Sequence, residues 1–209
     1  MLKMISNHGL AIVMSGLVLY FAVKFGNIYI ENLKAKRGAK SHDELAALRH
    51  QVSTTIQTLL DRAILRTRGC RVYVFEFHNG SIGMGGLPFL KMSCIYEALG
   101  ESVKSVARGR ENMSMSLYST LVESLYQHPF VILDVENRQP EIESSLGYET
   151  LIKWGVIVSV RIKITDINRR AIGFVGVDYT ERPDDATLQN AISVMQDVAV
   201  EVGALLSVK

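Results

Sequence analysis

A long apolar stretch stands near the start of the sequence. No residue between Lys3 and Lys24 is charged, and residues 9–23 are almost wholly apolar. A helix of about 20 such residues crosses the hydrocarbon core of a bilayer. The span can continue past Lys24, because a long lysine side chain reaches the polar interface while its neighbours stay in lipid. The pattern predicts a single transmembrane anchor over residues 1–33, with the lipid bilayer as a partner.

A cleavable signal peptide is the competing interpretation of this stretch. The segment lacks a small-x-small cleavage site, and its apolar block is longer than a usual signal-peptide core, so an anchor is favoured. The N-terminal flank holds Lys3 and the α-amine. The C-terminal flank holds more positive charge, at Lys24, Lys34, Lys36, Arg37 and Lys40. The positive-inside rule then predicts a single-pass membrane protein whose C-terminal domain is cytoplasmic, behind a basic linker over residues 34–40.

An amphipathic helix is predicted after this linker. Ser41 and Glu44 have the spacing of a capping box, which marks a helix start. The apolar positions that follow recur every three or four residues, at Leu45, Leu48, Val52, Ile56, Leu59 and Ala63. The spacing is close to that of a coiled-coil seam, so the helix could pair with a second copy of itself in a homodimer. The same stripe also suits packing on the domain's own sheet, and the sequence leaves both open.

A strand rich in β-branched and aromatic residues is predicted over residues 70–78, and the dipeptide Asn79-Gly80 predicts a tight turn after it. Alternation divides the side chains between two faces. One face holds Val72, Val74, Glu76 and His78, and the other holds Tyr73, Phe75 and Phe77. Because both faces begin apolar, the strand is expected in the centre of its sheet. A glycine-rich loop is predicted over residues 81–88.

The rest of the chain alternates between strand and helix patterns. Strands are predicted over residues 89–97, 130–135, 155–164 and 171–179, and helices over residues 117–127 and 142–154. The last two strands form a hairpin, and a closing helix is capped by Asp184 or Asp185. The pattern predicts one α+β domain over residues 41–209, with a mostly antiparallel central sheet flanked by helices.

Composition narrows the class of protein. After the anchor and linker, roughly 150 residues remain, enough for one domain with a hydrophobic core. A net charge of +2 gives no electrostatic drive toward nucleic acid, and no basic arm is present in the sequence. Cys70 and Cys94 have neither CxxC nor metal-ligand spacing, so buried free thiols are expected.

Glu76, His78 and Asn79 form the best candidate site, because they end a central strand beside a glycine loop. We expect them to be polar anchors of a small-molecule pocket, with Met92 and Tyr96 as further lining residues. They could also act as a general-base pair, or Glu76 could bind backbone amides while His78 and Asn79 close a turn. The interpretation in which these residues bind backbone amides and close a turn is favoured over catalysis. No enzyme activity, catalytic residue or metal site is therefore predicted.

The order of elements resembles that of a GAF domain, with a PAS-like domain as the alternative. The resemblance rests on the amphipathic helix, the strand at 72–77, Gly155 before a hairpin, the sequence 172–176 (Ile-Gly-Phe-Val-Gly) and a closing helix after Pro183. The resemblance implies a sensor domain that binds a small molecule, such as a cyclic nucleotide or a tetrapyrrole. Such domains often dimerise through their terminal helices. This sequence has no clear cyclic-nucleotide signature and no cysteine placed for a bilin, so the cofactor is unknown.

A second resemblance gives the alternative function. The single-span holins of T-even-type phages similarly join one membrane span to a mixed α/β domain that ends in a hairpin and an amphipathic helix. Those proteins carry the domain outside the cytoplasm. The sequence therefore favours a membrane-anchored, non-catalytic sensory or regulatory module that binds a small molecule or partner protein, and a holin acting in host lysis is the alternative.

Overall fold

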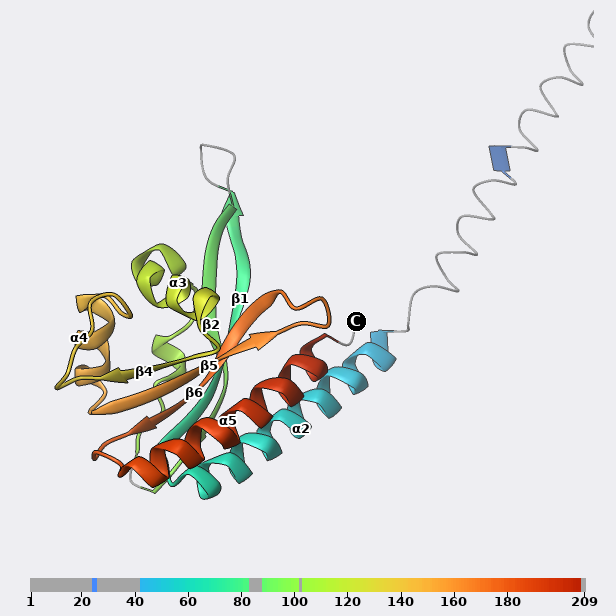
Figure 1. The fold of residues 1–209 in the computed structure, drawn as a ribbon. Coiled ribbons are helices and arrows are strands. Elements are labelled where there is room, and N and C mark those ends of the chain that lie inside the picture. The colour runs from blue at the N-terminus through green and yellow to red at the C-terminus, as the bar shows by residue number, and fades with distance from the viewer. Residues whose placement is uncertain (1–23, 26–41, 83–87, 102, 208–209) are drawn as a thin grey trace, which may run out of the picture. The chain divides into compact units, whose positions relative to one another are not determined.

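The computed structural model describes residues 24–25, 42–82, 88–101 and 103–207 (Figure 1). The chain divides into two compact units, Met1–Arg49 and His50–Lys209. The predicted anchor, apart from Lys24 and Phe25, and the whole predicted linker lie outside the described residues. None of the helices in the described ranges is both long enough and apolar enough to cross a bilayer.

An antiparallel sheet forms the centre of the second unit. In the described residues it has six strands in the order β3-β2-β1-β6-β5-β4, and each neighbouring pair is antiparallel. The strands are β1 (Arg71–Ile82), β2 (Pro88–Leu99), β3 (Met113–Ser114), β4 (Phe130–Asp134), β5 (Val158–Thr165) and β6 (Ala171–Tyr179). The predicted antiparallel sheet and the predicted hairpin of the last two strands are confirmed.

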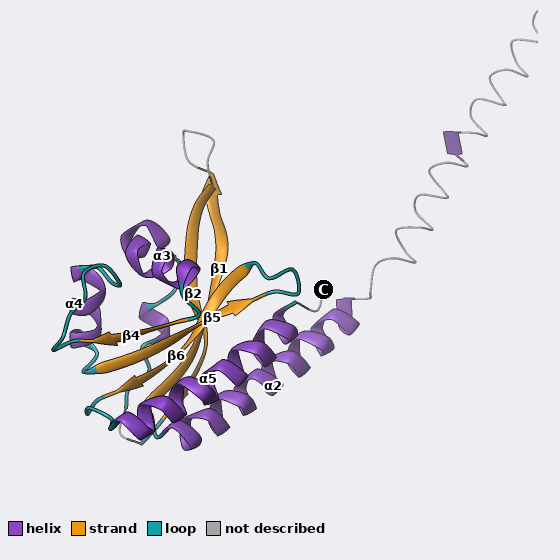
Figure 2. Ribbon diagram, viewed as in Figure 1, coloured by secondary structure: helices purple, strands orange, loops and turns teal. Residues whose placement is uncertain are grey.

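Helices cover both faces of this sheet (Figure 2). The part of α2 (His42–Thr67) from His50 onward and the helix α5 (Asp185–Leu206) lie on one face. The other face carries α3 (Ser119–Gln127), α4 (Ser145–Lys153) and the 3-10 helices η1 (Ala107–Gly109) and η2 (Met115–Tyr118). Two separate hydrophobic cores therefore form, one on each side of the sheet.

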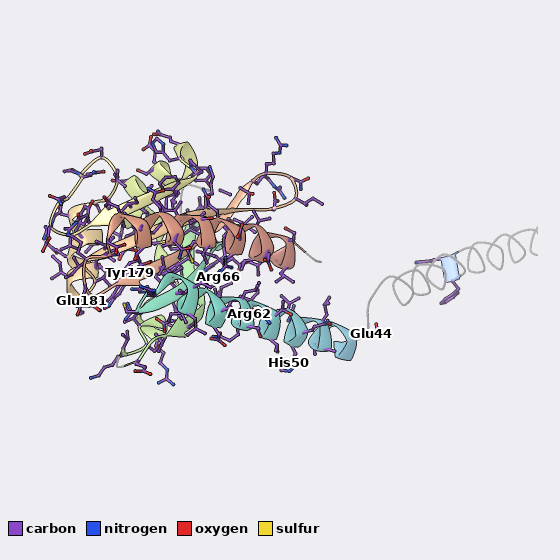
Figure 3. All side chains as sticks on the ribbon, turned by 60° about the horizontal axis from the view of Figure 1, so that its bottom comes forward. Glu44, His50, Arg62, Arg66, Tyr179 and Glu181 are labelled. Carbon is purple, nitrogen blue, oxygen red and sulfur yellow. The ribbon has the colours of Figure 1, made fainter. Side chains whose placement is uncertain are left out.

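The larger core lies between the sheet and the two long helices. Val158, Val160, Ile162 and Ile164 of β5 all face it, as their alternation predicts. From His50 onward, α2 packs against α5 in the opposite direction: the Asn190 side-chain amide donates to the Arg66 carbonyl over 2.8 Å. Tyr179, whose hydroxyl donates to the Thr67 carbonyl over 2.9 Å, lies at the same end of the pair as Arg66, away from His50 (Figure 3).

The apolar stripe of α2 packs on the domain's own sheet. Ile56, Leu60 and Ala63 are buried in the larger core, and Leu59 is only partly buried beside it. The stripe is therefore centred one residue away from the predicted Leu59. Packing on its own sheet was one of the two uses that the sequence left open for this helix. Homodimerisation stays a prediction.

One turn prediction is wrong. β1 does not end at Asn79 and Gly80 but continues to Ile82, and Asn79 pairs with Leu90 of β2. A register irregularity between Asn79 and Ile82 accommodates the Asn-Gly dipeptide within the ladder. The pairing with β2 outweighs the local turn preference. The glycine-rich loop that was predicted next lies partly outside the described residues.

Candidate functional site

A small cavity lies in the second core, on the sheet face opposite α2 and α5. Its walls include Phe75 of β1, Met92 of β2 and Phe174 of β6, with Thr150 and Trp154 from α4 and its C-terminal end. Two arginines, Arg110 and Arg161, also line it. We call this space the arginine cavity. Its volume open to the centre of a water molecule is about 20 Å³, room for about one water.

Strand alternation builds a polar row beside this cavity. Arg71 of β1 and Ser159 of β5 both pair with Asp178 of β6, so three polar side chains stand side by side on one face. In the next row, Tyr73 and Arg161 flank Gly176. A Cβ atom on Gly176 would overlap the Tyr73 ring. The glycine thus leaves room for the ring to lie across the sheet.

Asp178 is the centre of the polar row. It is completely buried, and one of its oxygens accepts hydrogen bonds from the Tyr73 hydroxyl (3.0 Å) and the Ser159 hydroxyl (2.8 Å). The other oxygen accepts from Nη1 of Arg71 at 3.0 Å. A buried carboxylate needs such partners to offset the cost of leaving water. Burial, followed by the charge of Asp178, raises the pKa of the Tyr73 hydroxyl, which keeps it a donor.

Arg71 connects the sheet to the segment before η1. Its Nε lies 3.1 Å from a carboxylate oxygen of Glu97 in β2, and its Nη2 donates to the Lys104 carbonyl over 3.1 Å. Glu97 in turn accepts from the Val106 amide at 3.3 Å. These contacts hold the chain that leads to Arg110 against the sheet.

Arg110 lies among aromatic rings. Its guanidinium carbon is 3.5 Å from the centre of the Trp154 ring and 5.0 Å from that of Tyr73, distances typical of cation–π contacts. Only 1% of the residue is exposed. Burial lowers the pKa of this guanidinium, and the charge of Asp178 opposes that shift. An arginine nevertheless stays protonated in proteins, so the cavity wall carries a buried cation.

Arg161 is held by Glu143, which stands just before α4. Its Nη1 lies 3.3 Å from one Glu143 oxygen, and the other oxygen accepts from the Ser144 amide at 2.8 Å. Burial raises the pKa of Glu143 against the opposing effect of Arg161. A Cβ atom on Gly147 would overlap the Glu143 side chain. Gly147 in α4 therefore makes room for the glutamate.

The structure separates the five residues predicted to bind a ligand. Met92 lines the arginine cavity, whereas the Tyr96 hydroxyl lies 2.9 Å from that of Ser53 in α2, on the opposite face. Alternation along β1 places Glu76 and His78 on the face opposite Phe75. His78 hydrogen-bonds to Ser93 through Nε2 at 2.9 Å, and Asn79 is exposed. Ligand binding by these five residues stays a prediction.

A bulge explains why the side chains of Met92 and Tyr96 lie on opposite faces of the sheet. Simple alternation puts residues 92, 94 and 96 on one face, but the pairing shifts register at Val74 and Phe75, which turns Tyr96 toward α2. The residues that sequence reasoning missed are those of the polar cluster: Arg71, Tyr73, Glu97, Arg110, Glu143, Ser159, Arg161 and Asp178. Polar positions that alternate with valines in β5 were a signal for Ser159 and Arg161.

The fold can be compared with those of known proteins. No family model and no curated protein matches the sequence. The phycoerythrobilin-bound GAF domain of a cyanobacterial phytochrome is similar in structure, with a TM-score of 0.55, 16% identity, and coverage of 78% of this chain and 90% of that one. The fold is GAF-like.

Two further solved structures are similar to this fold. The blue-light absorbing form of the PixJ GAF domain of Thermosynechococcus elongatus has a TM-score of 0.54 at 10% identity, over 75% of this chain and 88% of that one. A far-red cyanobacteriochrome photoreceptor has a TM-score of 0.53 at 13% identity, over 84% and 95%. The GAF resemblance predicted from the sequence is therefore confirmed for the fold. At such identities the likeness says nothing of which ligand this chain binds.

Proposed function

We propose that this protein is a membrane-anchored sensory or regulatory module that binds a small molecule in the arginine cavity and catalyses no reaction. The observation that carries the proposal is the cavity itself, where Phe75, Phe174 and Trp154 supply apolar walls and Arg110 and Arg161 supply charge. Small-molecule sites typically combine mostly apolar walls with a few well-placed polar groups. The GAF-like fold supports the sensory role by analogy.

The two carboxylates nearest the cavity favour a binding role over catalysis. Asp178 uses both oxygens in hydrogen bonds to Tyr73, Ser159 and Arg71. Glu143 likewise uses both oxygens, on Ser144 and Arg161. A general base needs an oxygen within reach of a substrate proton. These groups instead hold the arginines in place.

A bilin, such as the one bound to the similar phytochrome domain, does not suit this cavity. The space is about 20 Å³, which is far below the ~300 Å³ or more of a typical ligand pocket. The thiol on this face, Cys94, is buried, and burial raises its pKa to about 12. A thiolate is the form that reacts with a ligand. We expect a smaller ligand that is held without a covalent bond.

A cavity-filling variant tests the site. The full chain is purified, and native mass spectrometry and melting temperature are used to detect bound molecules, with panels of cyclic nucleotides, tetrapyrroles and small carboxylic acids. Thr150→Phe adds a ring to the cavity wall and is expected to abolish the shift in melting temperature that a ligand produces. Thr55→Phe is the matched control, because Thr55 is exposed on α2.

The two threonines lose the same kind of bond when they are replaced. The Thr150 hydroxyl donates to the Leu146 carbonyl at 2.7 Å, and the Thr55 hydroxyl donates to the Gln51 carbonyl at 2.9 Å. A ligand bound equally by both variants lies elsewhere, which would contradict the assignment of the site. If neither the wild-type chain nor the control binds any member of the panels, the binding function itself loses its support.

The membrane anchor is part of the proposal, and its support is the uncharged apolar stretch of residues 9–23. A reporter fused to the C-terminus measures the side of the membrane on which the domain lies. We expect activity from a reporter that works only in the cytoplasm, because the basic residues follow the span. External placement would instead favour the holin alternative, and recovery in the soluble fraction would exclude the anchor.

A further inference from the structure

Arg110 has donors that no partner satisfies. Its Nε and Nη2 are buried and have no hydrogen-bond partner among the described residues. The residue is 1% exposed, so bulk water does not replace the missing partners. Buried polar groups in proteins are almost always hydrogen-bonded, and each exception calls for an explanation such as a missing ligand. Arg110 lines the arginine cavity, where such a ligand could reach it.

The carboxylate nearest to Arg110 does not fill this role. Nη2 of Arg110 lies 3.7 Å from an oxygen of Asp178, close enough for charge attraction but too far for a hydrogen bond. That oxygen already accepts from Arg71 at 3.0 Å. Asp178 therefore offsets the charge of Arg110 in part and leaves the directional donors free.

Arg161 adds a second buried guanidinium with a free donor. Its Nε is also buried without a partner, while its Nη1 pairs with Glu143. Its guanidinium carbon lies 5.5 Å from the centre of the Phe174 ring. Both arginines line the same cavity, so an acceptor placed there can meet donors from two directions.

We propose that the arginine cavity binds a small carboxylate through Arg110 and Arg161. The planar guanidinium fork matches a carboxylate in bidentate geometry. Formate and acetate are the smallest carboxylates and exceed the one-water space of the cavity by only a few atoms, for which the unbranched side chains of Met92 and Met113 in its wall can make room. The apolar part of the molecule would contact the stacked rings of Phe75 and Phe174, whose centres are 4.8 Å apart. This inference rests on the proposed function and names its ligand class.

The chain has a built-in reporter for this site. Trp154 is the only tryptophan in the sequence, and the Arg110 guanidinium stacks on its ring. The purified full chain is titrated with sodium formate and sodium acetate while sodium chloride holds the ionic strength constant. We expect a saturable change in Trp154 fluorescence and a rise in melting temperature with formate or acetate, and neither with chloride.

Variants of two nearby arginines give the control. Arg110→Met keeps an unbranched side chain of similar length but removes every donor, and it is expected to weaken carboxylate binding by about tenfold or more, the equivalent of one charge-assisted hydrogen bond. Arg108→Met removes an exposed arginine two residues earlier in η1 and is expected to bind as the wild type does. If Arg110→Met does not fold, Thr150→Phe blocks the cavity with both arginines intact and is expected to lose the same signal.

The outcomes separate this inference from the proposed function. Equal binding of formate and acetate by wild type and Arg110→Met would overturn the carboxylate assignment. So would a folded wild-type chain that shows no saturable response to either anion. If such a chain still bound another small molecule of the panels and lost it on Thr150→Phe, the proposed function would stand and the carboxylate inference alone would fail.

Discussion

Replacing Asp178 with asparagine is expected to lower the free energy of unfolding by about 3–5 kcal/mol, the usual cost of removing one partner from a buried ion pair. Asp178 is completely buried and pairs with Arg71 at 3.0 Å and Arg110 at 3.7 Å. An asparagine of the same shape supplies an acceptor without a charge. Two buried guanidinium groups would then lack their shared counter-charge.

Denaturant unfolding of the full chain, followed by Trp154 fluorescence, measures this loss. Asp197→Asn is the matched control, because it makes the same substitution at an exposed position of α5. Its effect is expected within about 0.5 kcal/mol, as for most surface substitutions. A loss below about 1 kcal/mol for Asp178→Asn would show that other groups compensate the charges of Arg71 and Arg110.

The polar cluster also explains how the cavity walls stay in place. Arg71 holds the segment that leads to Arg110 through its contacts with Glu97 and Lys104. Arg161 holds the start of α4 through Glu143. Both anchoring arginines project from the central strands of one sheet. The cavity wall that faces the sheet, which includes α4 and Arg110, is therefore held by these ion pairs in addition to the apolar contacts of the second core.

The regular elements could be predicted because their patterns are local. The last strand, Ala171–Tyr179, was predicted with its exact bounds, and the inward face of β5 follows directly from alternation. The polar face of the same strands, with Ser159 and Arg161, was equally visible in the alternation. It was missed because polar residues in a strand are usually solvated, and here the second layer of helices buries them.

The position of Arg110 could not be predicted from the sequence. It lies in an irregular segment after η1, where no periodicity indicates which side chains turn inward. Its place depends on long-range contacts, including the hydrogen bond from the Cys94 amide to its carbonyl at 2.9 Å. The sheet face on which Tyr96 lies could not be predicted for a related reason, since a bulge shifts the alternation of β2.

Replacing Leu60 with alanine is expected to lower the free energy of unfolding by about 2–5 kcal/mol. Leu60 is completely buried between α2 and the sheet. Its loss leaves a cavity that neighbours on the sheet and α5 fill only in part, because their backbones are fixed by the ladder and by the helix pair. The same denaturant measurement on the full chain applies.

Leu65→Ala on the same helix is the matched control, because Leu65 is 80% exposed. We expect it to change stability by no more than about 0.5 kcal/mol. If Leu65→Ala lowered the free energy of unfolding as much as Leu60→Ala does, the outer face of α2 would not be exposed to solvent. If the loss at Leu65 then grew with protein concentration, the outer face would be buried against a second copy, as the homodimer prediction requires. The pair of variants thus separates packing on the domain's own sheet from pairing between chains.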